Sequence, residues 1–411
     1  MSVAQNSKEK GFRAVGLLTL VSLCMVSACA TLPRTPVPVD NINDVTVPNM
    51  PDVRAWGGEF SPAFQRDFIE STRQEVVALL YELGSPRNYA ALALSGGGAD
   101  GAFGAGFLNG WSTSGTRPDF KLVTGISTGA LIAPFAFLGT DYDAKLKEVF
   151  TTISTDNIIK INSIFSILFR SESFAGSKPL QDLIAEYIDE ELLKAIADRH
   201  EQGYRFFIGT TNMDAQRFVV WNMGKIATYA TPQALDLFHK IMVASASIPV
   251  ALPPVMIEVE MNGLRYDEMH TDGGTFAQMF FHTGIVDLGA VAENVGIDKL
   301  LTSDLYIIRN GHLDPDVRQI DRKLSDISER ALSTMIKTAA KNDLYRIYTF
   351  TRRDDIRFHY VDIPAEHFSE ADEIFDQAEM NRLYDVGYEL GISKNNWKDQ
   401  PPGFLEFEKQ L

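Results

Sequence analysis

Short apolar runs alternate along most of the chain with stretches of helical periodicity. Apolar, β-prone runs ending in glycine-rich or polar turns predict buried strands, and apolar residues every three or four positions predict helices. The predicted strands cover 89–95, 120–127, 204–212, 217–221, 305–311 and 357–363, with a hairpin over 255–269 turning at Asn262-Gly263. The predicted helices cover about 62–83, 102 onward, 128–139, 180–188, 232–246, 322–347 and 369–390. This alternation predicts a three-layer α/β/α fold with a mostly parallel central sheet.

The first 28 residues have the pattern of a secretory signal. A basic start precedes an apolar stretch over 14–26 that is short for a membrane span, and small residues lead to Cys29. The sequence "VSAC" over 26–29 resembles the bacterial lipoprotein cleavage motif, in which the cysteine becomes the acylated first residue. We therefore expect 1–28 to be a lipoprotein signal peptide and an acylated, palmitate-bearing Cys29 to anchor the protein to a membrane. An ordinary signal peptide with a chance cysteine is the alternative.

The residue after Cys29, the cysteine count and the net charge indicate the location of the protein and exclude some classes of partner. Ala30, rather than aspartate, follows Cys29, which predicts the outer membrane of a bacterial envelope. Cys24 lies within the predicted signal, so one thiol would remain and we expect neither a disulfide nor a cysteine metal site. The formal net charge of −16 would become −18 once the signal, with three basic residues and one acidic residue, is removed. Such a field repels nucleic acid and anionic lipid surfaces, so neither is expected as an electrostatic partner.

Four segments are predicted along the chain. After the signal, 29–87 would hold a lipidated tether, rich in proline and polar residues up to about 52, and one packing helix. The strand-helix alternation and the chemical motifs lie in 88–290, and 291–411 would form a C-terminal α/β extension.

The pentapeptide "GISTG" over 125–129 matches a nucleophile elbow. Such an elbow places a serine on a sharp strand-to-helix turn, where flanking glycines remove side chains that would clash. An apolar strand precedes Ser127 and a helix-forming run follows it. Ser127 is therefore a candidate nucleophile, with a turn serine of no chemical role as the alternative.

The stretch "GGGADG" over 96–101 admits two interpretations. The positions of Gly96, Gly98 and Gly101 match the spacing of a dinucleotide-binding loop, but such a loop also requires an acid at the end of the second strand. Asp119 instead precedes its strand. Successive glycines at a helix N-terminus can also direct backbone N–H groups at a developing oxyanion, which suits an acyl-transfer enzyme.

A serine nucleophile requires a base. Histidines available for a Ser-His-Asp triad are His282, His312, His359 and His367, none of them in a recognisable motif. His270 lies two residues before Asp272, so both side chains would project from one face of an extended chain. A carboxylate can also accept the serine proton if burial raises its pKa.

The ordered segments "LALSGGGADGAFGAGFL", "LVTGISTGALIA", "ASASIPVALPPV" and "HTDGG" resemble the patatin-like phospholipase family over about residues 90–290. The resemblance implies an acyl hydrolase of lipid esters with Ser127 as nucleophile and Asp272 as general base. It also implies an oxyanion hole made by the N–H groups of Gly97 and Gly98. The remaining motif glycines are Gly96, Gly101, Gly125, Gly129, Gly273 and Gly274. No cofactor is implied, and the sequence offers no calcium-ligand pattern, so we expect no metal requirement.

Two features lie outside this pattern. Many relatives carry arginine or lysine where this chain has Asp100, so recognition of a phospholipid head group at this point is less securely expected. The segment 158–169 has an apolar helical stripe, predicted to be a core helix or a flap beside an acyl-chain pocket. A lipid-binding protein without catalytic activity, built on the same scaffold, is the alternative from another functional class.

Overall fold

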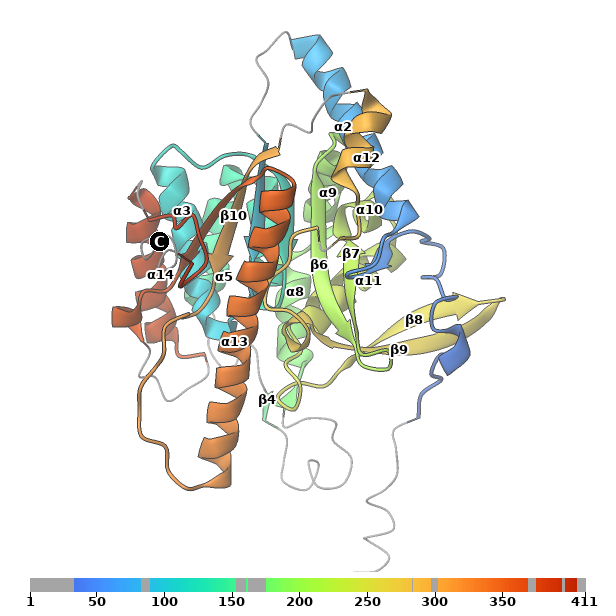
Figure 1. Cartoon of the computed structure of the whole chain (residues 1–411). Coiled ribbons are helices and arrows are strands. Elements are labelled where there is room, and N and C mark those ends of the chain that lie inside the picture. Colours follow the sequence, from blue (N-terminus) through green and yellow to red (C-terminus); the bar gives the residue numbers. More distant parts are fainter. Residues whose placement is uncertain are drawn as a thin grey trace, which may run out of the picture.

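Within the described residues, nine strands form one central sheet in the order β1-β7-β6-β3-β2-β10-β11, with β9 also paired to β6 and β8 to β9 (Figure 1). The computed structural model describes residues 33–82, 89–152, 160–161, 175–282, 284–296, 302–368, 375–393 and 396–404. The strands are β1 (Arg54–Trp56), β2 (Tyr89–Leu94), β3 (Phe120–Gly125), β6 (Arg205–Asn212), β7 (Arg217–Asn222), β8 (Val255–Met261), β9 (Leu264–Asp272), β10 (Thr302–Arg309) and β11 (Arg357–Asp362). A separate pair is formed by β4 (Lys160–Ile161) and β5 (Ala175–Gly176).

Helices cover both faces of the sheet, as the alternating pattern predicts. They are α2 (Pro62–Glu82), α3 (Gly101–Thr113), α4 (Thr128–Leu138), α5 (Asp143–Thr152), α8 (Lys178–Tyr187), α9 (Glu190–Glu201), α10 (Met223–Thr228), α11 (Pro232–Ser245), α12 (Leu288–Val295), α13 (Leu324–Arg353) and α14 (Gln377–Ile392). Along β2, Leu92 and Leu94 pack into the core beneath α3, α4 and α14, whereas Ala91 and Ala93 pack into the core beneath α2, α12 and α13. The three-layer α/β/α fold is therefore confirmed.

Parallel strands make up the middle of the sheet. The pairs β6–β3, β3–β2, β2–β10 and β10–β11 are all parallel, so their carboxyl ends lie along one edge. The antiparallel strand β9 enters beside β6 and pairs Asp272 with Thr210. Loops at the carboxyl edge of parallel strands are the usual position of a site in this architecture.

Residues beyond 290 complete this sheet. Strand β10 lies between β2 and β11, and α14 packs along α3. The two helices approach closely through glycine, since a Cβ on Gly106 would overlap the backbone of Tyr384 and one on Gly387 would overlap the backbone of Phe103. The domain boundary expected near 290 therefore coincides with no break in the sheet.

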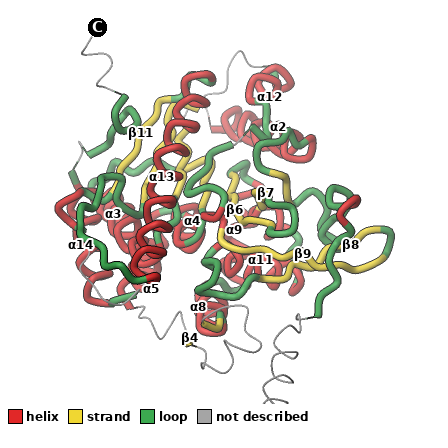
Figure 2. The backbone as a smooth tube through the Cα atoms, turned by 60° about the horizontal axis from the view of Figure 1, so that its bottom comes forward, coloured by secondary structure: helices red, strands yellow, loops and turns green. Residues whose placement is uncertain are grey.

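The segment expected to be a tether is docked from its first described residues. Residues 33–56, which we call the N-terminal strap, lie against the β8–β9 hairpin and end in β1, which pairs with β7 (Figures 1 and 2). The small side chains of Val37 and Val45 pack with Val259 of the hairpin. Isolated bridges and ion pairs hold the strap, and such contacts leave no periodic apolar pattern in a sequence.

Most predicted elements occur within a few residues of their expected bounds. The hairpin turns at Asn262-Gly263, both at positive φ, as predicted. The prediction for 158–169 falls largely outside the described residues, where only Lys160–Ile161 are seen, as β4. None of the described helices combines the length and the apolar content that crossing a bilayer would require.

Candidate active site

Ser127 lies at a sharp turn between β3 and α4. Its φ of 54° and ψ of −126° place a non-glycine residue in a strained region of backbone space, typical of functional turns. Neighbouring backbone leaves no room for side chains at the flanking positions, because a Cβ on Gly129 would overlap the Leu94 carbonyl and one on Gly125 would overlap the Gly129 carbonyl. This is the geometry that the elbow motif predicts, with Ser127 at the N-terminus of a helix.

The C-terminal end of α11 and the residues just after it contact both the Ser127 turn and Asp272. The Ser127 N–H donates to the Ser245 hydroxyl over 3.0 Å, and that hydroxyl donates to the Gly209 carbonyl over 2.8 Å. Two residues later, the Ser247 carbonyl accepts the N–H of Asp272 over 2.9 Å. Neither serine belongs to the residues singled out from the sequence, although both lie in the family-like segment "ASASIPVALPPV".

Asp272 ends β9 with its carboxyl group directed at the nucleophile. This carboxyl accepts a hydrogen bond from the Gly274 N–H over 2.6 Å, and the Ser127 hydroxyl acts on it closely enough to lower its pKa. Burial raises the pKa of Asp272 to about 7, an effect that these two groups only partly offset. Asp272 is therefore poised to accept and return a proton near neutral pH.

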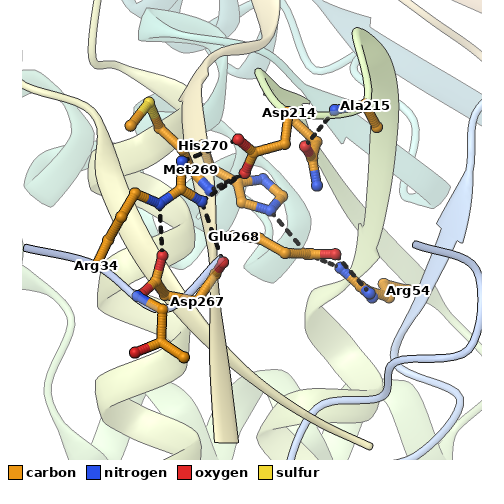
Figure 3. A network of polar contacts seen from close by, with 10 residues as sticks. Arg34, Arg54, Asp214, Ala215, Asp267, Glu268, Met269 and His270 are labelled. Atoms are coloured by element: carbon orange, nitrogen blue, oxygen red, sulfur yellow. Dashed lines mark hydrogen bonds and ion pairs between the residues drawn. The ribbon is translucent and has the colours of Figure 1, made fainter. Parts of the chain in front are cut away.

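The histidines have partners elsewhere. His270 is fully buried, and its Nε2 lies 3.2 Å from the Glu268 carboxyl (Figure 3). Its Nδ1 lies 2.9 Å from the Thr210 hydroxyl, so both ring nitrogens are engaged by groups other than Ser127. The recorded contacts of the other candidates are His282 with Asp354, His312 with the Ile363 carbonyl, His359 with Asp304 and Asp399, and His367 with Arg382. This geometry does not assemble a Ser-His-Asp triad.

The glycine loop lies directly beside the nucleophile. A Cβ on Gly96 would lie 3.2 Å from the Ser127 Cβ, and one on Gly101 would overlap the Thr128 side chain. Gly98 adopts a φ of 59°, which favours glycine. Within the described residues, the N–H groups of Gly97 and Gly98 donate to no other group. They are therefore available to an oxyanion formed at Ser127.

A buried cation supports this loop from β10. Arg309 donates to the Gly96 carbonyl over 2.6 Å and to the Ser95 hydroxyl over 3.1 Å. Asp100 lies partly buried in the loop; burial raises its pKa to about 6, against the lowering effect of the Arg309 charge. Sequence reasoning missed Arg309, although its position at the carboxyl end of a predicted parallel strand could have identified it.

No described group of three or more His, Cys, Asp or Glu side chains is arranged to hold a metal ion. Asp119, the acid considered for a dinucleotide site, pairs instead with Arg199 over 2.5 Å and with the Tyr204 hydroxyl. The described residues thus bring together a serine, a carboxyl group and free backbone donors, a set suited to acyl transfer.

Comparison with known proteins agrees with this chemistry. A family model described as patatin-like phospholipase matches residues 92–298, just over half of the chain. Among solved structures, the crystal structure of VipD from Legionella pneumophila is similar with a TM-score of 0.36 and 11% sequence identity, covering 92% of this chain and 73% of that one. No match was found among curated proteins. The chain belongs to the patatin-like phospholipase family, and this membership implies a lipid acyl hydrolase.

Proposed function

We propose that this protein is a serine acyl hydrolase that cleaves acyl esters of lipids with a Ser127–Asp272 dyad. The observation that carries the proposal is the position of a strained elbow serine beside a buried carboxyl group whose pKa is raised to about 7. A base of that pKa is half ionised at neutral pH and needs no histidine to accept the serine proton.

The proposed reaction proceeds through a covalent acyl-serine. The Asp272 carboxylate takes the Ser127 proton as the serine oxygen attacks the acyl carbonyl, and the N–H groups of Gly97 and Gly98 hold the resulting oxyanion. Collapse of this intermediate breaks the ester bond, and the Asp272 carboxyl group returns its proton to the departing alkoxide. Asp272 then deprotonates a water molecule, which attacks the acyl-serine; when the acyl–serine bond breaks, Asp272 returns this proton to the Ser127 oxygen, and the fatty acid is released.

A fluorophosphonate probe tests the nucleophile. We expect the purified protein to be labelled, Ser127→Ala to be unlabelled and Asp272→Asn to label far more slowly. Ser333→Ala removes an exposed serine on α13 and is a matched control that should label like the wild type. Labelling retained in Ser127→Ala would contradict the proposal. An unreactive wild type that still binds lipid vesicles would favour the lipid-binding alternative.

Attachment to a membrane through acylated Cys29 is part of the proposal. Pro33 follows Cys29 by four residues, which span at most about 14 Å of extended chain. An acyl anchor would therefore hold the N-terminal strap and the β8–β9 hairpin close to the bilayer. We expect metabolic labelling with an alkynyl palmitate analogue in a bacterial host to modify the wild type and not Cys29→Ser. Equal labelling of the two would contradict the anchor.

A further inference from the structure

Two consecutive residues, Arg309 at the end of β10 and Asn310 just after it, hold the glycine loop in place through hydrogen bonds. The Asn310 side-chain amide donates to the Ser95 carbonyl over 2.8 Å, and the Asn310 N–H donates to the Ser95 hydroxyl over 2.8 Å. Gly97 packs so closely on this point that a Cβ there would overlap the Asn310 carbonyl. Both Arg309 and Asn310 lie outside residues 92–298, the part that matches the family model.

Arg309 contacts the loop at one particular peptide unit. Its Nη1 lies 2.6 Å from the carbonyl oxygen of Gly96, and the same peptide unit carries the N–H of Gly97. A charged donor at a carbonyl polarises the whole peptide and strengthens the N–H at its other end as a hydrogen-bond donor. The contact also fixes the rotation of this peptide, and therefore the direction in which the Gly97 N–H points.

The surroundings of Arg309 fit this role better than that of an ordinary ion pair. Within the described residues, Arg309 donates hydrogen bonds to Ser95, Gly96 and Gln278, and none of these acceptors is a carboxylate. Its buried Nε has no hydrogen-bond partner among the described residues. The carboxyl groups that act on it through their charge are Asp100, Asp343 and Asp362. Burial lowers the pKa of Arg309 to about 10, so the guanidinium stays protonated at neutral pH.

Gln278 extends this connection to the base. Its side-chain oxygen lies 3.3 Å from Arg309 Nη1, and its side-chain nitrogen donates to the Gly274 carbonyl over 2.8 Å. Gly274 in turn donates its N–H to the Asp272 carboxyl. The guanidinium is thus hydrogen-bonded to the peptide of the proposed oxyanion hole and, through one side chain, to the turn that holds the proposed base.

We propose that Arg309 is a positioning residue that orients and polarises the Gly96–Gly97 peptide, so that the Gly97 N–H becomes a strong oxyanion donor. The inference rests on the proposed acyl-hydrolase function. Asp100 occupies the fifth position of the glycine loop, and the cation that contacts the loop is Arg309 from β10. Arg309 acts through backbone and does not contact the substrate.

The experiment compares Arg309→Gln and Arg309→Lys with the wild type on p-nitrophenyl butyrate, with active sites counted by fluorophosphonate titration. We expect Arg309→Gln to lower kcat per active site by about 10- to 100-fold with KM nearly unchanged, because an oxyanion donor acts on the transition state. Arg309→Lys keeps the charge and should recover much of the loss. A trifluoromethyl ketone, whose serine adduct carries an oxyanion, should lose affinity in proportion to kcat/KM in both variants.

Arg205→Gln is the matched control. Arg205 is also a buried arginine, but it donates to Asp67 at the opposite end of the sheet, so its loss should lower stability without changing kcat per active site. If Arg309→Gln keeps the wild-type kcat, or if both variants lose kcat equally, the inference is overturned while the proposed function stands. If Arg309→Gln does not fold, Arg309→Met takes its place as the neutral variant, and wild-type values for both kcat and ketone affinity in Arg309→Met would overturn the inference. A wild type that does not react with the probe overturns the function and this inference together.

Discussion

Glu268 and Asp272 lie four residues apart on β9, and their carboxyl groups have opposite electrostatic environments. Glu268 and Asp272 are both buried, at 0% and 4% exposure. Burial opposes ionisation of Glu268, but the charge of Arg54 and hydrogen bonds from Arg54 and His270 hold its pKa at about 2. Among the described residues no cation acts in this way on Asp272, and burial raises its pKa to about 7.

The difference shows that a neighbouring cation, and not burial, separates the pKa values of the structural carboxylate and of the proposed base on this strand. Arg54 belongs to the N-terminal strap, so Glu268 uses its fixed charge to hold a distant segment against the hairpin (Figure 3). Arg34 makes a similar attachment through Asp214 and Asp267. Asp272 keeps a pKa near neutral because the two groups that favour its ionised form, a hydroxyl and a backbone N–H, carry no charge.

Asp272→Asn should have the largest effect on activity. The amide cannot accept the Ser127 proton, so kcat should fall roughly 10³-fold, within the range lost with a general base. The free energy of unfolding at pH 8 should stay equal or rise, because the variant no longer buries an unpaired negative charge. Ester hydrolysis and urea unfolding measure the two quantities. If Asp272→Asn lost stability as well as activity, Asp272 would have a structural role like that of Glu268, and its assignment as the base would be contradicted.

Arg54→Met should produce the reverse pattern. It leaves the Glu268 carboxylate buried without its cation, and breaking a buried pair in this way costs about 3–5 kcal/mol of unfolding free energy. Activity per titrated active site should stay near the wild-type value. The double variant Arg54→Met/Glu268→Gln removes both charges and should regain part of the stability in the same urea measurements. Loss of kcat at unchanged stability would show that the strap acts on the chemistry.

The residues that were predictable from sequence are those whose role depends on their immediate neighbours in the chain. The elbow at Ser127 requires glycine two residues away on each side. In β2, alternate residues pack into the two cores on either side of the sheet. Both features can therefore be predicted from a short stretch of sequence. Asp272 was identified through the resemblance, since a D-G-G turn alone is not specific.

Contacts between distant segments left no comparable signal. The strap docks through ion pairs such as Arg54 with Glu268, 214 residues apart, and its proline-rich composition is equally typical of a free tether. Arg309 reaches the glycine loop only because β10 pairs with β2 in the sheet. The order of strands in a sheet cannot be predicted from the sequence of either strand alone. His270 is the reverse case, because its closeness to Asp272 in sequence leaves a role in the chemistry open, whereas its ring contacts Thr210 and Glu268.

The pH dependence should follow Asp272 alone. Only the ionised carboxylate can act as base, so kcat/KM should rise about tenfold per pH unit below about 7 and level off above it. Stability should change in the opposite direction, because the folded-state pKa of Asp272 is raised: its contribution is present below about 4 and is lost as pH rises through about 7. Glu268, with a lowered pKa, contributes stability that is lost only as pH falls towards about 2. A profile without a step near 7 would contradict the assignment of the base.

His270→Asn should have the smallest effect on catalysis, and it separates the dyad from a triad. The ring bonds Thr210 and Glu268, and burial lowers its pKa, so it is a neutral part of the strap attachment. We expect lower stability, a kcat per active site close to the wild type and an unchanged pH profile. His282→Asn, another fully buried histidine with a carboxylate partner, is the matched control and should behave alike. If His270→Asn alone abolished acylation of Ser127, the proton would pass through His270, and the division of β9 into a structural and a chemical carboxylate would fail.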